Sequence, residues 1–90
     1  MEKFRVILQS QPEKYYHKVD VKTAKALEEC FINLEKNPFY FPGRIKKLKG
    51  RESLFRYATH HLRVVYEIEQ RSKTVGVVAI LPRGDVYKKI

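Results

Sequence analysis

Three segments of alternating apolar residues follow one another in the second half of the chain, and they constrain the fold more than any other feature. They span residues 54–59, 62–69 and 74–81 and are separated by short turns. An alternation with a period of two is typical of β-strands that bury one face. The last segment is apolar on both faces, which indicates an internal strand. The sequence therefore predicts an antiparallel meander.

The connection between the first two of these strands predicts their register. If His60 and His61 form a two-residue turn, Phe55 opposes Tyr66 on an apolar face that packs against helices. The other face then carries Leu54, Arg56, Ala58, Arg63, Val65 and Glu67. Arg56 and Arg63 become diagonal neighbours on this open face. The hairpin thus predicts a pair of arginines that no helix covers.

The first half of the chain reads as one strand followed by two helices. Residues 3–9 alternate like a strand, and Ser10 with Glu13 has the spacing of a capping box that begins a helix ending near Val19. Asp20 can cap a second helix that ends at Asn37–Pro38. One stripe of that helix is apolar at Ala24, Leu27, Phe31 and Leu34.

The element order is therefore β-α-α-β-β-β. This order predicts an α+β fold in which a helical hairpin packs on one face of an antiparallel four-stranded sheet. The 90 residues suffice for one domain, residues 1–90. Phe39, Tyr40 and Phe41 are expected to close the end of the core, with base stacking as the alternative use.

The cysteine count, the length of the apolar segments and the first residues exclude several classes of protein. Cys30 is the single cysteine, so it cannot form an intrachain disulfide, and we expect it to act as a small hydrophobic residue at the edge of the core. The apolar segments fall short of the roughly 20 residues that a membrane helix needs, and the first residues do not resemble a signal peptide. We expect a cytoplasmic protein with no membrane partner.

Positive charge is concentrated in the second half of the chain. The formal net charge is +9; residues 1–43 hold 7 basic and 6 acidic side chains, whereas residues 44–90 hold 12 basic and 4 acidic ones. One run contains five cations and no acid: Arg44, Lys46, Lys47, Lys49 and Arg51. Such a run attracts nucleic acid, an anionic membrane surface or an acidic protein, although dispersed charge often serves solubility alone. We favour a polyanion site.

No sequence motif indicates a metal or a small-molecule cofactor. The chain has no Walker loop, no nucleophile elbow and no cysteine pair, and His60 and His61 are adjacent without a third ligand at metal-like spacing. The candidate site is then a cationic set of Arg56, Arg63, Arg83 and Tyr87. Such a set suits attack by an RNA 2′-hydroxyl on its own phosphate, with arginine forks holding the added charge. Alternatively, the arginines only bind phosphates and Tyr87 packs on the sheet.

Four short motifs in order resemble the RelE/ParE toxin superfamily of type II toxin–antitoxin systems. They are Leu48-Lys49-Gly50, Leu54-Phe55-Arg56-Tyr57, Leu62-Arg63-Val64-Val65-Tyr66, and the segment from Ile80 through Pro82-Arg83-Gly84-Asp85 to Tyr87-Lys88. The resemblance extends over essentially the whole chain. It implies a RelE-like, microbial ribonuclease-type fold.

The RelE-like branch implies a toxin that cleaves mRNA on the ribosome without a metal and is held inactive by a cognate antitoxin. The resemblance makes Arg56, Arg63, Arg83 and Tyr87 the catalytic candidates. RNA-binding roles fall to Lys46, Lys47, Lys49, Arg51, His60 and His61. Partners would be the ribosome, mRNA and the antitoxin, with no cofactor.

Two positions depart from the usual pattern of this superfamily. Ala58 occupies a position that is often basic, and His60-His61 replaces a Gly-Asp turn. Arg83 and Tyr87 nevertheless favour RNA cleavage, because the ParE branch generally lacks that pair. The alternatives are a ParE-like inhibitor of DNA gyrase and a non-catalytic basic module that binds RNA or an antitoxin.

Overall fold

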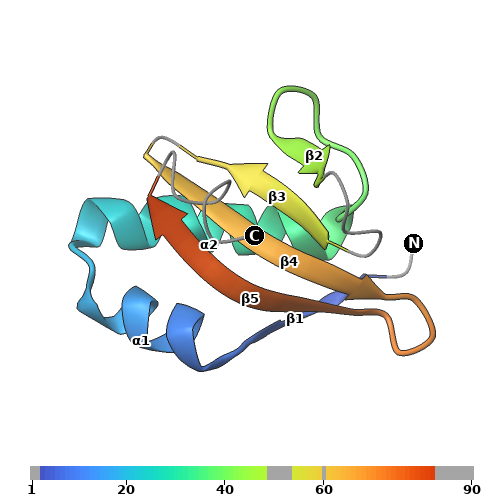
Figure 1. Cartoon of the computed structure of the whole chain (residues 1–90), viewed down its shortest axis with the longest axis horizontal. Helices are drawn as coiled ribbons and strands as arrows, with labels where there is room; N and C mark the ends of the chain where they lie inside the picture. Colours follow the sequence, from blue (N-terminus) through green and yellow to red (C-terminus); the bar gives the residue numbers. More distant parts are fainter. Residues whose placement is uncertain (1–2, 49–53, 60, 83–90) are drawn as a thin grey trace.

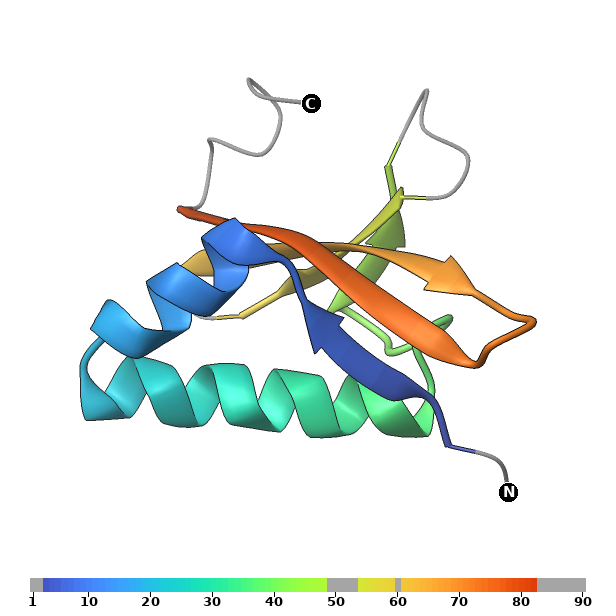
Figure 2. The ribbon, with the colours of Figure 1, turned by 90° about the horizontal axis from the view of Figure 1, so that it is seen from below.

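The fold is an α+β sandwich of two helices on one mixed sheet. The computed structural model describes residues 3–48, 54–59 and 61–82. In chain order the elements are β1 (Arg5–Leu8), α1 (Ser10–Lys18), α2 (Val21–Lys36), β2 (Ile45–Lys47), β3 (Leu54–Ala58), β4 (Leu62–Glu69) and β5 (Thr74–Pro82). The strands lie in the order β1-β5-β4-β3-β2 (Figure 1). Both helices cover the same face of the sheet (Figure 2), which confirms the predicted fold class.

The sheet differs from the predicted antiparallel four-stranded sheet in two ways. It has a fifth strand, β2, which pairs antiparallel with β3 and lies in the segment predicted as a basic loop. In addition, β1 pairs parallel with β5, so the sheet is mixed. A strand of three residues with two lysines is too short to show a period, and lysines are common on sheet edges. The alternation of β1 fits either strand direction, so the path of the chain decides the pairing.

The predicted capping box at the start of α1 is wrong. The N-cap is Gln9, and no side chain caps this end of the helix. The Glu13 amide donates to the Gln9 carbonyl oxygen over 3.0 Å. Because the helix begins at Ser10 itself, the Ser10 hydroxyl is not in the cap position that a capping box requires. By contrast, Asp20 caps α2 as predicted, since its carboxylate accepts from the Thr23 amide over 3.3 Å.

The main core lies between α2 and the sheet. Leu27 and Leu34, two members of the predicted stripe, are fully buried, and Phe31 packs at the margin. Cys30 is also fully buried, so it lies within the core. The sheet contributes Tyr57, Leu62, Val64, Tyr66, Val75, Val77 and Ile80. Neither α1 nor α2 covers the opposite face of the sheet (Figure 2).

The hairpin of β3 and β4 has the predicted register. Phe55 pairs with Tyr66 and Tyr57 pairs with Val64, both on the helix-facing side. Farther along, the pairing of β4 with β5 shifts after Val65, which leaves Val78 as an extra residue on β5. Such a bulge explains the two consecutive valines, because Val77 faces the helices while Val78 packs with the opposite face.

Candidate functional site

Three cations share one end of the open face, the side of the sheet that neither α1 nor α2 covers. Lys46 on β2 pairs directly with Arg56 on β3, and Arg63 on β4 pairs with Ala58, two residues beyond Arg56. Directly opposite residues have Cβ atoms about 5 Å apart and diagonal ones about 7 to 8 Å apart, within reach of long side chains. Lys46, Arg56 and Arg63 therefore form a cation cluster, and the predicted diagonal placement of the two arginines is confirmed.

Backbone carbonyl groups orient both guanidinium groups. Arg56 donates from Nη1 to the carbonyl oxygen of Arg44 over 2.9 Å. Arg63 donates from Nη1 to the carbonyl oxygens of Leu62 (3.0 Å) and Thr59 (3.2 Å). The side chains are half-buried, so their aliphatic stems are packed. Because these hydrogen bonds already restrict the rotation of each guanidinium, binding an anion costs little further side-chain entropy.

The Nε atom of Arg56 is a buried donor at the centre of the cation cluster. It is buried and meets no hydrogen-bond acceptor among the described residues. A buried donor without a partner costs about 1 to 3 kcal/mol, so such groups are rare outside binding sites. The positions across from Arg56 are occupied by Lys46 and Val65, neither of whose side chains can accept a hydrogen bond. An anionic oxygen can satisfy this donor only if the guanidinium turns toward the open face, because Nε itself is buried.

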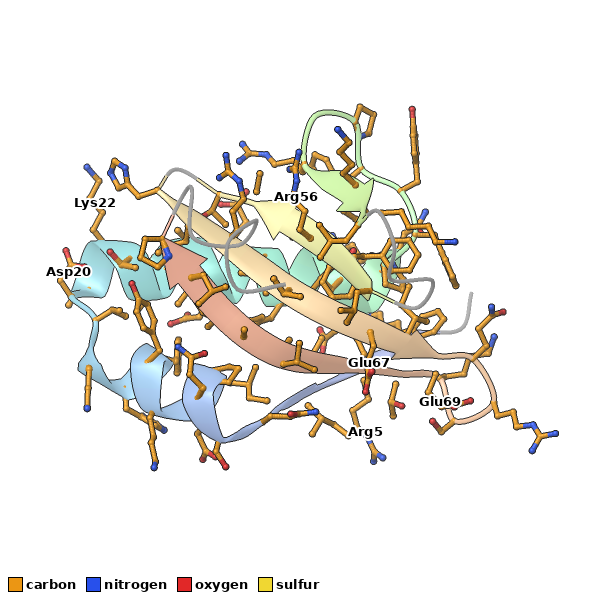
Figure 3. The ribbon with its side chains drawn as sticks, viewed as in Figure 1. Arg5, Asp20, Lys22, Arg56, Glu67 and Glu69 are labelled. Carbon is orange, nitrogen blue, oxygen red and sulfur yellow. The ribbon has the colours of Figure 1, made fainter. Side chains whose placement is uncertain are left out.

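The surroundings of the cation cluster strengthen its field. An apolar cluster of Leu48, Val65 and Leu81 lies on the same face, and all three are buried. A surface of this kind lowers the local dielectric, which strengthens attraction to an anion. Glu67 lies on the other diagonal from Arg56, opposite to that of Arg63, and its side chain lies beside Gly76 of β5, while Glu69 lies two residues farther along β4 (Figure 3). The face is therefore polarised, with its cationic end on β2 and β3.

The arrangement can bind phosphate and stabilise negative charge, but its two arginines cannot remove a proton. Arginine stays protonated at any physiological pH and therefore cannot act as a base. Burial strongly raises the pKa of the Cys30 thiol, so this group does not supply a nucleophilic thiolate. Burial also raises the pKa of Tyr57, whose hydroxyl accepts from Asn33 on the helix side. A proton-transfer group must therefore come from a residue other than these.

The structure separates other sequence-predicted residues from this site. Lys47 pairs with Phe55 and so projects from the helix-facing side. His61 lines a groove of about 790 Å³ beside α2, together with Arg44 and Tyr57. The remaining candidates lie outside the described residues: Lys49, Arg51, His60, Arg83 and Tyr87. The cation cluster as described is thus Lys46, Arg56 and Arg63.

Arg44 is a neighbour of the site that the sequence pattern alone does not assign to it. Its carbonyl oxygen holds Arg56, and its own Nη1 donates to the Ala58 carbonyl oxygen over 3.1 Å. The one signal in the sequence is that Arg44 begins the basic run. Its role depends on the turn at Gly43, where a φ of +76° turns the chain into β2. The sequence does not show that this turn brings Arg44 beside Ala58.

Two further properties concern metals and membranes. Within the described ranges, His, Cys, Asp and Glu side chains form no group of three or more that could hold a metal ion. Neither described helix has the length and apolarity needed to cross a membrane.

A family model described as "ParE toxin of type II toxin-antitoxin system, parDE" matches residues 4–87. The match spans the cation cluster and the C-terminal candidates alike. No curated protein sequence matches the chain significantly.

Solved structures of toxins share the fold. The archaeal RelE–RelB complex from Pyrococcus horikoshii OT3 contains a chain with a TM-score of 0.79 and 24% identity, covering 90% of this chain and 96% of that one. The isolated E. coli RelE toxin gives a TM-score of 0.75 at 17% identity, covering 96% of this chain and 93% of that one. A YoeB/ParE toxin from Agrobacterium tumefaciens gives 0.76 at 16% identity, covering 89% and 99%. At these identities the likeness establishes the fold.

Proposed function

Because the chain belongs to the ParE toxin family of type II toxin–antitoxin systems, within the RelE/ParE superfamily, we propose that it is a toxin that cleaves mRNA on the ribosome. The observation that carries this proposal is the cation cluster, in which Arg56 has a buried Nε without an acceptor among the described residues. Lys46 and Arg63 lie beside it. A phosphodiester supplies the anionic oxygens that these groups require.

The proposed reaction is an internal transesterification of RNA. The 2′-oxygen of one nucleotide attacks the adjacent phosphorus while a base removes its proton. The bond from phosphorus to the 5′-oxygen of the next nucleotide breaks, and that oxygen gains a proton. The products are a 2′,3′-cyclic phosphate and a 5′-hydroxyl. The phosphorane between them carries additional negative charge, which Arg56 and Arg63 stabilise more than they stabilise the substrate.

The proton transfers are assigned to the C-terminal segment. Neither arginine of the cation cluster can serve as a base, and the Cys30 thiol is buried. Tyr87 is the group proposed to orient the substrate or move a proton, and Arg83 is proposed to hold the phosphate together with the cation cluster. Lys49, Arg51, His60 and His61 are proposed to contact RNA.

We propose a cognate antitoxin as the protein partner of this chain. The structural relatives include RelE–RelB complexes from Pyrococcus horikoshii OT3, Mycobacterium tuberculosis and E. coli. An antitoxin that places acidic side chains on the cation cluster would satisfy Arg56 in place of phosphate. Such a contact would exclude RNA by direct competition.

Inhibition of DNA gyrase is the second candidate function. The description of the matching family model favours it, because that model is named for ParE. A gyrase inhibitor would leave translation unaffected and produce stalled DNA breaks. The cation cluster would then have no phosphodiester to cleave, and Arg56→Met would leave toxicity unchanged.

Primer extension on a translated mRNA tests the proposed function. We expect discrete cuts within codons when the full-length protein and ribosomes are both present, and none when ribosomes are omitted. Absence of cuts together with normal translation would contradict the proposal. Inhibited supercoiling by purified gyrase in a parallel reaction would then support the second candidate, and no effect in either reaction would indicate a non-catalytic binding module.

A further inference from the structure

The segment between α2 and β2 presents two aromatic side chains to solvent. Tyr40 keeps 69% of its surface exposed and Phe39 keeps 42%. The sequence predicts that this segment closes the end of the core. Phe41 does so by packing against Tyr57, whereas Phe39 contacts the margin of the core by its edge and stays partly exposed. Large exposed apolar side chains that adjoin one another often mark an interaction site. The two exposed rings are therefore candidates for contact with a ligand.

The backbone that carries these rings is firmly anchored. Pro38 is buried, and its carbonyl oxygen accepts from the Tyr66 hydroxyl over 2.7 Å inside the core. The Phe39 amide donates to Oδ1 of Asn37 over 2.9 Å, which closes a local turn. A segment fixed by a buried hydrogen bond loses little conformational entropy when a ligand binds. Tyr40 follows directly after this anchor.

Edge contacts also fix the Phe39 ring. Its centroid lies 5.8 Å from that of Phe4 and 6.5 Å from that of Phe55, with interplanar angles of 79° and 87°. Edge-to-face geometry of this kind is favourable for aromatic pairs. Phe55 is in turn stacked on Tyr66, at 5.8 Å and 17°. Phe39 thus extends a row of aromatic side chains that begins in the core, and Tyr40 is the next residue in the chain.

Lysines accompany the exposed rings. Lys47 is exposed and projects to the helix-facing side, where it pairs with Phe55. The Nζ atom of Lys73 lies 5.3 Å from the centre of the Phe4 ring. We call Phe39, Tyr40, Lys47 and Lys73 the aromatic–lysine patch. The two lysines thus lie beside Phe4 and Phe55, the rings that contact Phe39, and such a set suits a ligand that has both flat bases and negative charge.

Strand β2 connects the aromatic–lysine patch to the cation cluster. It is an edge strand of the sheet, and its consecutive lysines point to opposite faces. Lys46 joins Arg56 on the open face, whereas Lys47 belongs to the aromatic–lysine patch. A single strand of nucleic acid that passes over this edge would meet cations on both sides.

We propose that the aromatic–lysine patch binds single-stranded RNA, with a base stacked on Tyr40 and a phosphate beside Lys47. Proteins that bind single strands combine such aromatic platforms with cationic tracks. The inference rests on the proposed function for the choice of RNA as the polymer. The RNA can be the mRNA that leads to the cation cluster or an unpaired segment of ribosomal RNA.

Binding of a short, fluorescently labelled, single-stranded oligoribonucleotide to the full-length protein tests the proposal. Its riboses carry 2′-O-methyl groups, so that it cannot be cleaved. Tyr40→Ala should weaken binding about tenfold, or about 1.4 kcal/mol, whereas Tyr40→Phe should bind like the natural protein because it keeps the ring. Tyr40→Leu should behave like Tyr40→Ala, because leucine is apolar but cannot stack. Ile32→Ala is the matched control, since Ile32 is 51% exposed on α2.

The salt dependence provides a second measurement. Lys47→Ala should reduce the slope of log affinity against log salt concentration by about 0.7, the value for one phosphate contact on a single strand. An unchanged affinity in Tyr40→Ala would overturn the proposal, and so would full affinity in Tyr40→Leu. Loss of antitoxin binding in Tyr40→Ala, with RNA binding intact, would also overturn it and assign the patch to a protein interface.

Two comparisons separate the possible RNA sources and the two proposals. If Tyr40→Ala weakens association with mRNA-programmed ribosomes only, the stacked base belongs to mRNA; if it weakens association with vacant ribosomes as well, the base belongs to ribosomal RNA. Both results support the patch.

Because the oligonucleotide cannot be cleaved, ring-dependent binding without mRNA cleavage by the natural protein would refute the proposed function alone. Cleavage with ring-independent binding would refute the aromatic–lysine patch alone.

Discussion

Replacement of Arg56 by methionine should separate stability from activity. Methionine keeps an unbranched stem but removes the charge and every donor. The variant loses the hydrogen bond of 2.9 Å to the Arg44 carbonyl oxygen, which contributes about 0.5 to 1.5 kcal/mol. It also removes the buried Nε that has no acceptor among the described residues, a relief of about 1 to 3 kcal/mol. The net change therefore runs from about 0.5 kcal/mol less stable to about 2.5 kcal/mol more stable.

Thermal unfolding and mRNA cleavage should respond in opposite ways. In a domain of this size 1 kcal/mol corresponds to about 4 to 8 °C in Tm, so Arg56→Met should either raise its Tm or lower it by no more than about 4 °C. Cleavage on ribosomes should fall by about 10² to 10³, the usual effect of removing one group that stabilises transition-state charge. Arg71→Met removes the same charge at an exposed turn position and should cleave normally. A Tm lowered by more than about 4 °C would contradict the buried-donor argument, and cleavage at the natural rate would refute the assignment of Arg56 to the site.

Three further predictions concern the scaffold. Gln11→Ala should lose about 1 to 3 kcal/mol in urea unfolding, because the Gln11 amide makes two hydrogen bonds, of 3.0 and 2.9 Å, to the backbone of Ile80; unchanged stability would show that water replaces them. The fully buried Cys30, whose thiol pKa is raised by burial, should resist thiol reagents until the protein is unfolded in urea, and rapid labelling of the native protein would contradict its placement. The pKa of Asp20 is lowered, chiefly by its hydrogen bond from Thr23. The cap therefore stabilises the fold at pH values above the unfolded pKa of about 3.9. This stabilisation is lost as the pH falls through the lower pKa of the folded state. The Tm difference between the natural protein and Asp20→Ala should therefore shrink in acid, and a constant difference would exclude the charged cap.

The register of the β3–β4 hairpin is predictable because two local rules determine it. A short turn and an alternating pattern leave few registers, and a slip by one residue would expose Tyr57 and bury Arg56. These rules place Arg56 and Arg63 on one face from the order of the residues alone, and the pairing of the two strands agrees. The same rules cannot find the parallel partner of β1, since pairing between distant segments depends on the path of the chain.

The remaining differences arise where tertiary context decides. The opposite directions of Lys46 and Lys47 follow only once β2 is known to pair with β3. The exposure of Tyr40 is not predictable either, because an aromatic side chain is buried only where another element covers it. The Tyr66 hydroxyl holds the neighbouring Pro38 in the core, and that contact joins residues 28 positions apart in the sequence. Long-range contacts of this kind leave no local pattern.

The central claim is that this chain cleaves mRNA on the ribosome through attack by the 2′-hydroxyl. The most direct test is single-turnover cleavage of an mRNA in ribosomes programmed with a defined codon in the A site, followed by analysis of the product ends. We predict a 2′,3′-cyclic phosphate on the upstream fragment, and no cleavage when the 2′-hydroxyl at the scissile nucleotide is replaced by hydrogen. Cleavage of the deoxy-substituted mRNA at the natural rate, or intact mRNA in both cases, would contradict the account.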